Sequence, residues 1–385
     1  MKILHVVGAR PNYMKVAPIM AEMGAHPRHF EQVLVHTGQH YDRNMSDGFF
    51  EQLGMAKPEE FLGVGSGTHA EQTARVMLVF EPVLLKHRPD WVFVVGDVNS
   101  TLACALVCAK LGIPVAHVEA GLRARDMTMP EEINRLLTDQ IADMLFTPSR
   151  DADDNLRREG ISPDKIHFVG NVMIDSLTRM LPAAVRLPVL SDFSLCPRKY
   201  VLATFHRPSN VDDPVKLREL LSALKAISRE FSVVFPVHPR TRRRITSLSE
   251  FSEDGLRLSE PLGYLEFLAL MNSAAAVLTD SGGVQEETTF LGVPCLTVRT
   301  STERPVTISK GTNRLVENNR TAIASAFAEA ISASPKNGNQ PELWDGRAAE
   351  RIVQAMLRIA HAERGSASLP RWQPVSIGSR CGQQL

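Results

Sequence analysis

The stretch that decides the fold is AAAVLTDSGGVQEETTFLGVPCLTVR, residues 274–299. It begins with a short apolar run, passes through Asp280, Ser281 and two glycines, continues with a helical pattern, and ends in a second apolar run. Short apolar runs bounded by turn residues indicate strands, and a helix between two strands makes a βαβ unit. Such units predict a parallel sheet with helices on its faces.

The same alternation runs through the rest of the chain and starts again after residue 171. The other apolar runs that we interpret as strands are KILHVV (2–7), FEQVLVHTG (30–38), DWVFVVGD (90–97), PVAHVEAG (114–121), LFTPS (145–149), KYVLATFHRP (199–208) and SVVFPVHP (232–239). A length of 385 residues also favours two domains, because single cores stop growing at roughly 250–300 residues. We therefore predict an α/β protein of two Rossmann-like, doubly wound parallel-sheet domains that face a cleft.

The domain boundary is expected at residue 172, with an N-terminal domain over 1–172 and a C-terminal domain over 173–363. The Pro-rich segment 181–197 shows little helical pattern and is interpreted as a loop or linker. The last predicted helix either stays with the C-terminal domain or packs back on the N-terminal one. The polar segment 364–385 lacks periodicity and is expected to be poorly ordered.

Charge, apolar runs and cysteines limit the class of protein. The chain has 43 basic and 43 acidic residues, which argues against bulk binding to nucleic acid or to an anionic membrane. No apolar run has the length of a membrane span, and the run at residues 3–7 is too short for a signal peptide. The five cysteines are irregularly spaced, without a ligand pattern, so we expect no metal site and a reducing, cytoplasmic environment.

Polar residues follow most of the predicted strands. In open parallel sheets, ligands bind outside the carboxyl ends of the strands, so these residues are the candidates for a substrate site. They are Arg10, Lys15, Gly96, Asp97, Glu119, His206, Arg207, His238, Asp280, Ser281 and Arg299. Their number favours one substrate site in the cleft between the domains.

The turn Ser281-Gly282-Gly283 leads directly from a strand into a helix. Glycines let a ligand approach the backbone, and the first amides of a helix attract an anion, which predicts a phosphate or diphosphate seat. A tight turn in which Ser281 only caps the helix would be the better interpretation of the turn alone. Arg304 and the Glu286-Glu287 doublet favour a nucleotide, with Glu287 placed to hold ribose hydroxyls.

Asp97 stands at the end of a predicted strand, too early to cap the helix that follows, where Asn99 or Ser100 would serve. A carboxylate at this place suits acid/base chemistry or a hydrogen bond to a sugar hydroxyl. The chain lacks GxGxxG after its first strand, a P-loop, HExxH and GxSxG, so no dinucleotide fingerprint supports a nicotinamide cofactor. The charged stretch 117–135 is either part of the site or a solvated loop.

Eight motifs together resemble the non-hydrolysing UDP-N-acetylglucosamine 2-epimerase family over nearly the whole chain except its tail. They are GARPNYMKVAP (8–18), GDVNSTLA (96–103), HVEAGLR (117–123), MPEEINR (129–135), TFHRPSN (204–210), PVHP (236–239), TDSGGVQEE (279–287) and TERP (302–305). The resemblance implies the two-domain GT-B fold and a homodimer. It also implies reversible conversion of UDP-GlcNAc to UDP-ManNAc without a cofactor, which feeds precursors of cell-surface polysaccharide or antigen.

The resemblance also implies roles for individual residues. The reaction would eliminate UDP across C1–C2 and add it back after reprotonation on the other face, with Asp97, Glu119 and Glu131 as acid/base groups. Glu132 would face away, because adjacent residues on a helix do not share a face. Residues implied for holding UDP are Arg10, Lys15, His206, His238, Phe267, Glu287, Arg304 and the amides of Ser281, Gly282 and Gly283, with His206 also counted as catalytic.

Several alternatives stay open at this point. The substrate could be another UDP-2-acetamido sugar, such as a diacetamido uronic acid. A hydrolysing epimerase would release UDP and free ManNAc, and a GT-B glycosyltransferase would share the fold and the UDP seat. A glycosyltransferase would not need three carboxylates around the donor ring.

Overall fold

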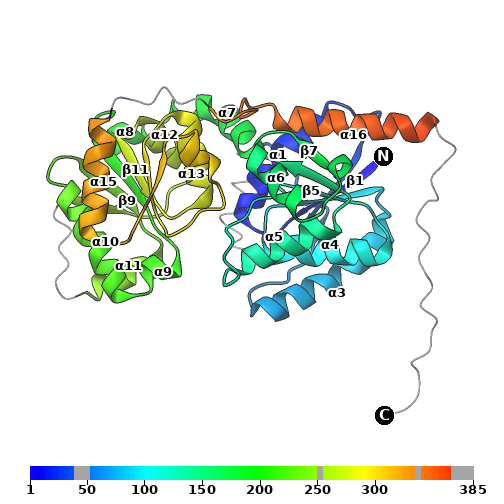
Figure 1. The fold of residues 1–385 in the computed structure, drawn as a ribbon, viewed down its shortest axis with the longest axis horizontal. Helices are drawn as coiled ribbons and strands as arrows, with labels where there is room; N and C mark the ends of the chain where they lie inside the picture. Colours follow the sequence, from blue (N-terminus) through cyan, green and yellow to red (C-terminus); the bar gives the residue numbers. More distant parts are fainter. Residues whose placement is uncertain (39–52, 249–254, 334–339, 366–385) are drawn as a thin grey trace, which may run out of the picture. The chain divides into compact units, whose positions relative to one another are not determined.

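The computed structural model describes residues 1–38, 53–248, 255–333 and 340–365 (Figure 1). The chain divides into two compact units. The N-terminal unit comprises Met1–Gly121, Asp126–Val169 and the chain from Ala349 onward, and the C-terminal unit comprises Leu122–Arg125 and Gly170–Ala348. The segment expected to be poorly ordered lies, from residue 366 on, outside the described residues.

The N-terminal unit is built on a parallel sheet of seven described strands in the order β3-β2-β1-β4-β5-β6-β7. The strands are β1 (Lys2–Val7), β2 (Glu31–His36), β3 (Glu60–Phe61), β4 (Trp91–Val95), β5 (Val115–Val118), β6 (Met144–Thr147) and β7 (Ile166–Phe168). Central strands read as apolar runs because helices cover both faces, and Val92, Phe93 and Val94 of β4 are fully buried.

The helices of this unit are α1 (Arg10–Gly24), α3 (His69–His87), α4 (Asn99–Leu111), α5 (Pro130–Ile141), α6 (Arg150–Arg158), the short 3₁₀ helix η1 (Pro163–Lys165) and α16 (Ala348–Gly365). Helices α3 and α5 both pack on α4 (Figure 1). Helix α16 contacts the N-terminal unit, since Arg351 donates to the carbonyl of Val169 at 3.1 Å and His361 meets His29 edge-to-face.

The C-terminal unit repeats the architecture with a parallel sheet in the order β10-β9-β8-β11-β12-β13. The strands are β8 (Tyr200–Thr204), β9 (Ser232–Pro236), β10 (Leu256–Ser259), β11 (Ala276–Thr279), β12 (Cys295–Val298) and β13 (Asn313–Val316). The helices are α7 (Val172–Ala184), α8 (Val189–Asp192), α9 (Pro208–Val211), α10 (Pro214–Ile227), α11 (Pro239–Thr246), α12 (Tyr264–Ser273), α13 (Gly282–Leu291), α14 (Val306–Ser309) and α15 (Arg320–Ser332). The prediction of two doubly wound parallel-sheet domains is therefore confirmed.

The interpretation of residues 181–197 as a loop was partly wrong. Helix α7 continues through Pro182 to Ala184, and α8 spans Val189–Asp192. Buried Ala184 and Val189 pack the end of α7 and the short helix α8 against the unit, whereas Pro182 and Pro188 hid the helical pattern in the sequence.

In each sheet the strand order reverses once, between β1 and β4 and between β8 and β11. At such a reversal the connections on the two sides run in opposite directions and leave an opening at the carboxyl edge of the sheet. Asp97 follows β4, and Asp280 follows β11. Both units therefore present candidate residues at the place where this architecture binds ligands.

Candidate functional site

Asp97 follows β4 and is held by two residues of α5. Nε and Nη2 of Arg135 bind Oδ2 of Asp97 at 3.0 and 2.9 Å, and Nδ2 of Asn134 donates to the carbonyl oxygen of Asp97 at 2.8 Å. The Arg135 side chain is 3% exposed and the Asp97 side chain 27% exposed. The buried cation therefore fixes a carboxylate that still reaches the surface of the unit.

A pocket of about 240 Å³ lies beside Asp97. Its lining residues are Ser66, Gly67, His69, Gln72, Asp97, Val98, Asn99, Pro130, Glu131 and Asn134. Two of the predicted acid/base residues, Asp97 and Glu131, thus share one pocket. The amides in the lining are interconnected, because Nδ2 of Asn99 donates to Gln72 at 2.8 Å and Nδ2 of Asn134 to Asn99 at 3.2 Å.

Glu131 and Glu132 point in different directions from the first turn of α5. Glu131 lines the pocket, whereas the Glu132 side chain is 2% exposed and pairs with the guanidinium of Arg135. Glu132 therefore turns into the interior of the unit, where it holds the same arginine that holds Asp97. The supporting roles of Asn134 and Arg135 did not emerge from the sequence, although both belong to the MPEEINR motif.

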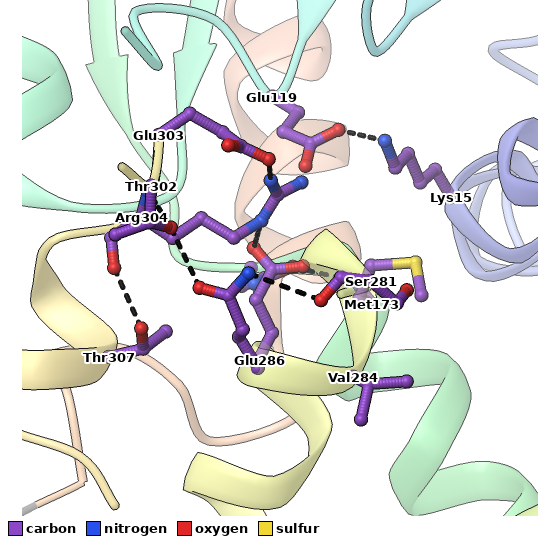
Figure 2. Close-up of polar contacts among 12 residues, drawn as sticks. Lys15, Glu119, Met173, Ser281, Val284, Glu286, Thr302, Glu303, Arg304 and Thr307 are labelled. Carbon is purple, nitrogen blue, oxygen red and sulfur yellow. Dashed lines mark hydrogen bonds and ion pairs between the residues drawn. The ribbon is translucent and has the colours of Figure 1, made fainter. Parts of the chain in front are cut away.

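Glu119 follows β5 in the left-handed region, with a φ of 70°. A non-glycine residue in this region stores roughly 1–3 kcal/mol of strain, which the surrounding structure must hold. The Glu119 carboxylate is nearly buried and pairs with the ammonium of Lys15 on α1 (Figure 2). Lys15 is thus placed beside a candidate catalytic carboxylate, and much of its charge is compensated there.

Gly96 directly precedes Asp97 in the chain and lies against the Lys15–Glu119 pair. A Cβ at this position would lie 2.8 Å from Nζ of Lys15 and 3.5 Å from Oε2 of Glu119, and the residue has a φ of 66°. Both facts favour glycine, which lets the ends of β4 and β5 and the start of α1 converge. Arg10 is the first residue of α1, and its side chain lies outside the described part of the chain.

In the C-terminal unit, Ser281, Gly282 and Gly283 form the turn from β11 into the ten-residue helix α13. The side chain of Ser281 accepts no capping hydrogen bond in this described turn, so the capping interpretation gains no support. A Cβ at Gly282 would lie 2.6 Å from Nη1 of Arg304 and 2.8 Å from Oε1 of Glu303. The first turn of α13, whose amides favour an anion, is therefore close to a guanidinium group.

Arg304 is 7% exposed and is enclosed by two carboxylates (Figure 2). Its Nε lies 2.9 Å from Oε1 of Glu286, and its Nη1 donates to Glu303. Glu303 also accepts from Nη2 of Arg299 at 2.7 Å. Arg304 thus lies beside Gly282, and its charge is opposed by Glu286 and Glu303.

Glu287 is buried on α13 and accepts a hydrogen bond from the hydroxyl of Tyr264 at 2.8 Å. Burial raises the pKa of Glu287 to about 7, and the neighbouring charge of Glu286 adds to the rise, while the Tyr264 hydrogen bond opposes it. Such a group is close to its titration midpoint at neutral pH.

His206 forms a pair with Asp280 that the sequence did not reveal. Nδ1 of His206 lies 2.9 Å from Oδ1 of Asp280, and the amides of His206 and Arg207 donate to the same carboxylate at 3.1 and 2.9 Å. Burial alone would raise the pKa of Asp280, but these hydrogen bonds and the His206 charge hold it below its usual range. An ionised Asp280 accepts a hydrogen bond from Nδ1–H of His206, so Nε2 faces away from it, on a side chain that is 60% exposed.

The two remaining predicted residues lie on the starts of other helices. His238 is the N-cap of α11, where its Nδ1 accepts from the amide of Arg240 at 3.3 Å, and its side chain is exposed. Phe267 is half-buried on α12. Among the described residues, no group of three or more His, Cys, Asp or Glu side chains is arranged to hold a metal ion.

Comparison with known proteins gives consistent matches over nearly the whole chain. The model of the family described as UDP-N-acetylglucosamine 2-epimerase matches residues 22–357. A UDP-N-acetylglucosamine 2-epimerase homolog of Methanococcus maripaludis is 43% identical over 365 residues, covering 93% of this chain and 100% of the relative. The UDP-2,3-diacetamido-2,3-dideoxy-D-glucuronate 2-epimerase of Pseudomonas aeruginosa is 42% identical over 363 residues, covering 93% of this chain and 100% of the relative.

A solved structure provides the same result in three dimensions. The UDP-GlcNAc 2-epimerase of Methanocaldococcus jannaschii, crystallised with UDP-GlcNAc and UDP, matches with a TM-score of 0.85 at 42% sequence identity. The match covers 93% of this chain and 100% of that one. On the family match, the relatives and the shared fold, the chain belongs to the UDP-N-acetylglucosamine 2-epimerase family.

Proposed function

We propose that this protein is an isomerase that interconverts UDP-GlcNAc and UDP-ManNAc by inverting C2 of the sugar. The observation that carries the proposal is the arrangement at the carboxyl ends of β4 and β5. Asp97 and Glu131 share a pocket there, and Gly96 links Asp97 to the Lys15–Glu119 pair. The similarity to an epimerase crystallised with UDP-GlcNAc and UDP supports the choice of substrate.

The chemistry explains why several carboxylates are needed. The hydrogen at C2 has no adjacent carbonyl and is not acidic, so direct removal is unfavourable. In an elimination, a base takes the C2 proton, the C1–O bond breaks, and UDP leaves with the bonding electrons. The product is 2-acetamidoglucal, and UDP adds back at C1 while an acid protonates C2 on the other face. Asp97, Glu119 and Glu131 supply the acid and base groups on this path.

The C-terminal unit supplies most of the groups that stabilise departing UDP. The amides at the start of α13 favour the diphosphate. Glu287, on the same helix, is proposed to hold the ribose hydroxyls. Asp280 fixes His206 with Nε2 turned away from the pair, where an Nε2–H donates to a phosphate oxygen. Arg10, Lys15, His238, Arg304 and Phe267 complete the proposed UDP-binding set.

A second substrate has a specific observation in its favour, since the Pseudomonas aeruginosa relative acts on a diacetamido glucuronate at 42% identity. The pocket beside Asp97 argues for a neutral sugar instead. Among the described residues, its lining contains the carboxylates of Asp97 and Glu131 and neither a lysine nor an arginine. A uronate carboxylate placed in this pocket would meet like charge.

The decisive experiment is proton NMR of the purified protein with UDP-GlcNAc and no nicotinamide. We expect the anomeric signals of both C2 epimers at a stable ratio that is the same from either side. Release of all the sugar as free ManNAc would identify a hydrolysing epimerase, and transfer to an added acceptor would identify a glycosyltransferase. Faster turnover of UDP-diacetamido glucuronate in parallel samples would move the assignment to that sugar.

We also propose that the protein is a homodimer, formed through apolar side chains on α3 and α5. Leu78 and Leu85 of α3 are 74% and 41% exposed, and Ile133 and Leu137 of α5 are 39% and 49% exposed. A second copy covering these helices would remove that surface from water. Light scattering of the wild-type protein should give a molar mass of two chains. Leu78→Glu should lower the molar mass to that of one chain. A wild-type monomer at assay concentration would refute the proposal.

A cytoplasmic location is proposed on the state of the cysteines. The four described cysteines carry free thiols, and Cys104, Cys108 and Cys295 are buried. Free thiols fit a reducing compartment. Among the described helices, none is long and apolar enough to cross a membrane.

A further inference from the structure

A fully buried histidine and aspartate lie behind the candidate acid/base residues. His117 of β5 and Asp139 of α5 are both 0% exposed. Nδ1 of His117 lies 2.6 Å from Oδ1 of Asp139, and Nε2 lies 2.8 Å from the carbonyl oxygen of Gly96. A carbonyl only accepts, so Nε2 carries a proton, and one more proton lies between Nδ1 and the carboxylate.

The pair holds the backbone on both sides of the site. Gly96 directly precedes Asp97, and Oδ2 of Asp139 accepts from the amide of Gly121 at 3.0 Å, two residues after Glu119. Through three hydrogen bonds, two side chains thus connect the turn after β4 to the turn after β5.

The turn after β5 needs such support because Glu119, a non-glycine residue, has a left-handed conformation with a φ of 70°. Gly96 and Gly121 have φ values of 66° and 82°, which glycine adopts readily. A Cβ at Gly121 would lie 2.5 Å from the carbonyl oxygen of Ala152, so the turn is also packed closely from outside. Strained turns persist only where surrounding contacts define them.

Helix α5 adds a second connection to Asp97. The same helix that carries Asp139 also carries Asn134 and Arg135, which bind the backbone and the carboxylate of Asp97. A displacement of Asp139 would therefore reach Asp97 both through His117 and through the helix.

We propose that His117 and Asp139 are positioning residues that set the spacing between Asp97 and Glu119. The inference rests on the proposed function, which gives those two carboxylates their catalytic roles. A buried charged pair is seldom the most stabilising filling for a core, and apolar residues of similar volume often do as well. This pair forms hydrogen bonds to the turns after β4 and β5, and apolar side chains could not hold those turns in the same way.

The test compares Asp139→Ala with Asp139→Asn. The asparagine keeps all three hydrogen bonds without the charge, because its oxygen accepts from Gly121 and its NH₂ donates to Nδ1 of a neutral His117. Nε2–H of that tautomer still donates to Gly96. Since misplacement by about 1 Å costs on the order of 10²-fold in rate, we expect Asp139→Ala to lower kcat by roughly 10- to 100-fold. Asp139→Asn should stay within about 3-fold of wild type.

Two further measurements separate positioning from general loosening. UDP affinity, measured by calorimetry on the folded variants, should not change, because the diphosphate seat at the start of α13 lies in the other unit and the variants leave Arg10 and Lys15 in place. His5→Ala serves as the matched control, since His5 is another fully buried histidine of the same sheet, bonded to Gln32 at 3.0 Å. It should lower the melting temperature and leave kcat near wild type. If Asp139→Ala does not fold, His117→Gln repeats the test. The single amide nitrogen of glutamine cannot donate both to Asp139 and to the carbonyl oxygen of Gly96, because these two acceptors lie on opposite sides of residue 117.

The outcomes distinguish this inference from the proposed function. Wild-type kcat in folded Asp139→Ala, or equal losses in Asp139→Asn and Asp139→Ala, would overturn the positioning role. Equal loss of kcat in His5→Ala would do the same. Asp97→Asn and Glu119→Gln are assayed alongside. If both keep turnover, the proposed catalytic roles are wrong and the positioning role is refuted with them.

Discussion

The two units share one architecture but use their carboxylates differently. In the N-terminal unit, the Asp97 side chain is 27% exposed and shares a pocket with Glu131. In the C-terminal unit, Asp280, Glu286 and Glu303 are at most 3% exposed and bind cations and amides.

This difference separates two uses of an acidic residue. A carboxylate that exchanges protons with a substrate must reach it, whereas a carboxylate that holds a cation in place is best buried with it. Glu119 lies between the two classes, since it is nearly buried and paired with Lys15. We expect changes to the candidate acids of the N-terminal unit to alter turnover and changes at the start of α13 in the C-terminal unit to alter UDP affinity.

The largest effect is expected from the acids of the N-terminal unit. Glu119→Gln and Glu131→Gln should each lower kcat by about 10²- to 10⁴-fold, because each removes a positioned proton donor or acceptor. UDP affinity by calorimetry should stay within about 3-fold, because neither residue belongs to the seat. Equal loss of kcat and affinity would end the distinction between the units.

Glu132→Gln is the control for this prediction. A glutamine still accepts from Arg135 and does not line the pocket, so turnover should fall much less than in Glu131→Gln. Thermal melting of every variant is needed, since a buried carboxylate that loses its partner destabilises the fold and imitates lost catalysis. Near-normal turnover in folded Glu119→Gln and Glu131→Gln would place the chemistry elsewhere.

The second effect concerns the pH dependence of stability in the C-terminal unit. Glu287 has a pKa of about 7 when folded, against 4.5 for an ordinary glutamate. The folded state therefore binds more protons between these values, and stability falls as pH rises through them, by up to about 3 kcal/mol. Glutamine does not titrate, so Glu287→Gln removes this loss. The free energy of unfolding of the variant, relative to that of wild type, should therefore rise from pH 5 to pH 8. Denaturant unfolding at both pH values checks this, and a constant difference would contradict it.

The smallest effect is expected at the seat. Gly282→Ala places a Cβ 2.6 Å from Nη1 of Arg304, which is held by Glu286 and Glu303, so the first turn of α13 must shift. UDP affinity should fall about 10-fold, or about 1.4 kcal/mol, with kcat nearly unchanged. At Gly283 the nearest atom to a Cβ is 3.8 Å away, so Gly283→Ala should leave the free protein's stability unchanged. Wild-type affinity in Gly282→Ala would remove Gly282 from the seat.

Most of the fold could be predicted because buried parallel strands are short apolar runs that turn residues separate. The strands around both reversals, β1, β4, β8 and β11, lie within the predicted runs. The C-terminal part of α7 and α8 escaped prediction because their prolines and short length conceal a pattern that tertiary packing stabilises.

The site was predictable only one residue at a time. Asp97 and Glu131 follow from strand ends, motifs and helix faces, but their partners come from elements far away in the sequence. Lys15 and Glu119 are 104 positions apart, and His206 and Asp280 are 74 apart. The compensation of Arg304 by Glu286 also depends on tertiary geometry that no local pattern contains.

The most direct test of the elimination mechanism is the fate of hydrogen at C2. The wild-type protein is incubated with UDP-GlcNAc in deuterated water, and the sugar products are analysed by NMR and mass spectrometry. The mechanism predicts one deuterium at C2 of UDP-ManNAc, because the proton removed by the enzyme is replaced from solvent-exchanged groups. UDP-ManNAc that keeps its original hydrogen at C2 throughout would contradict it.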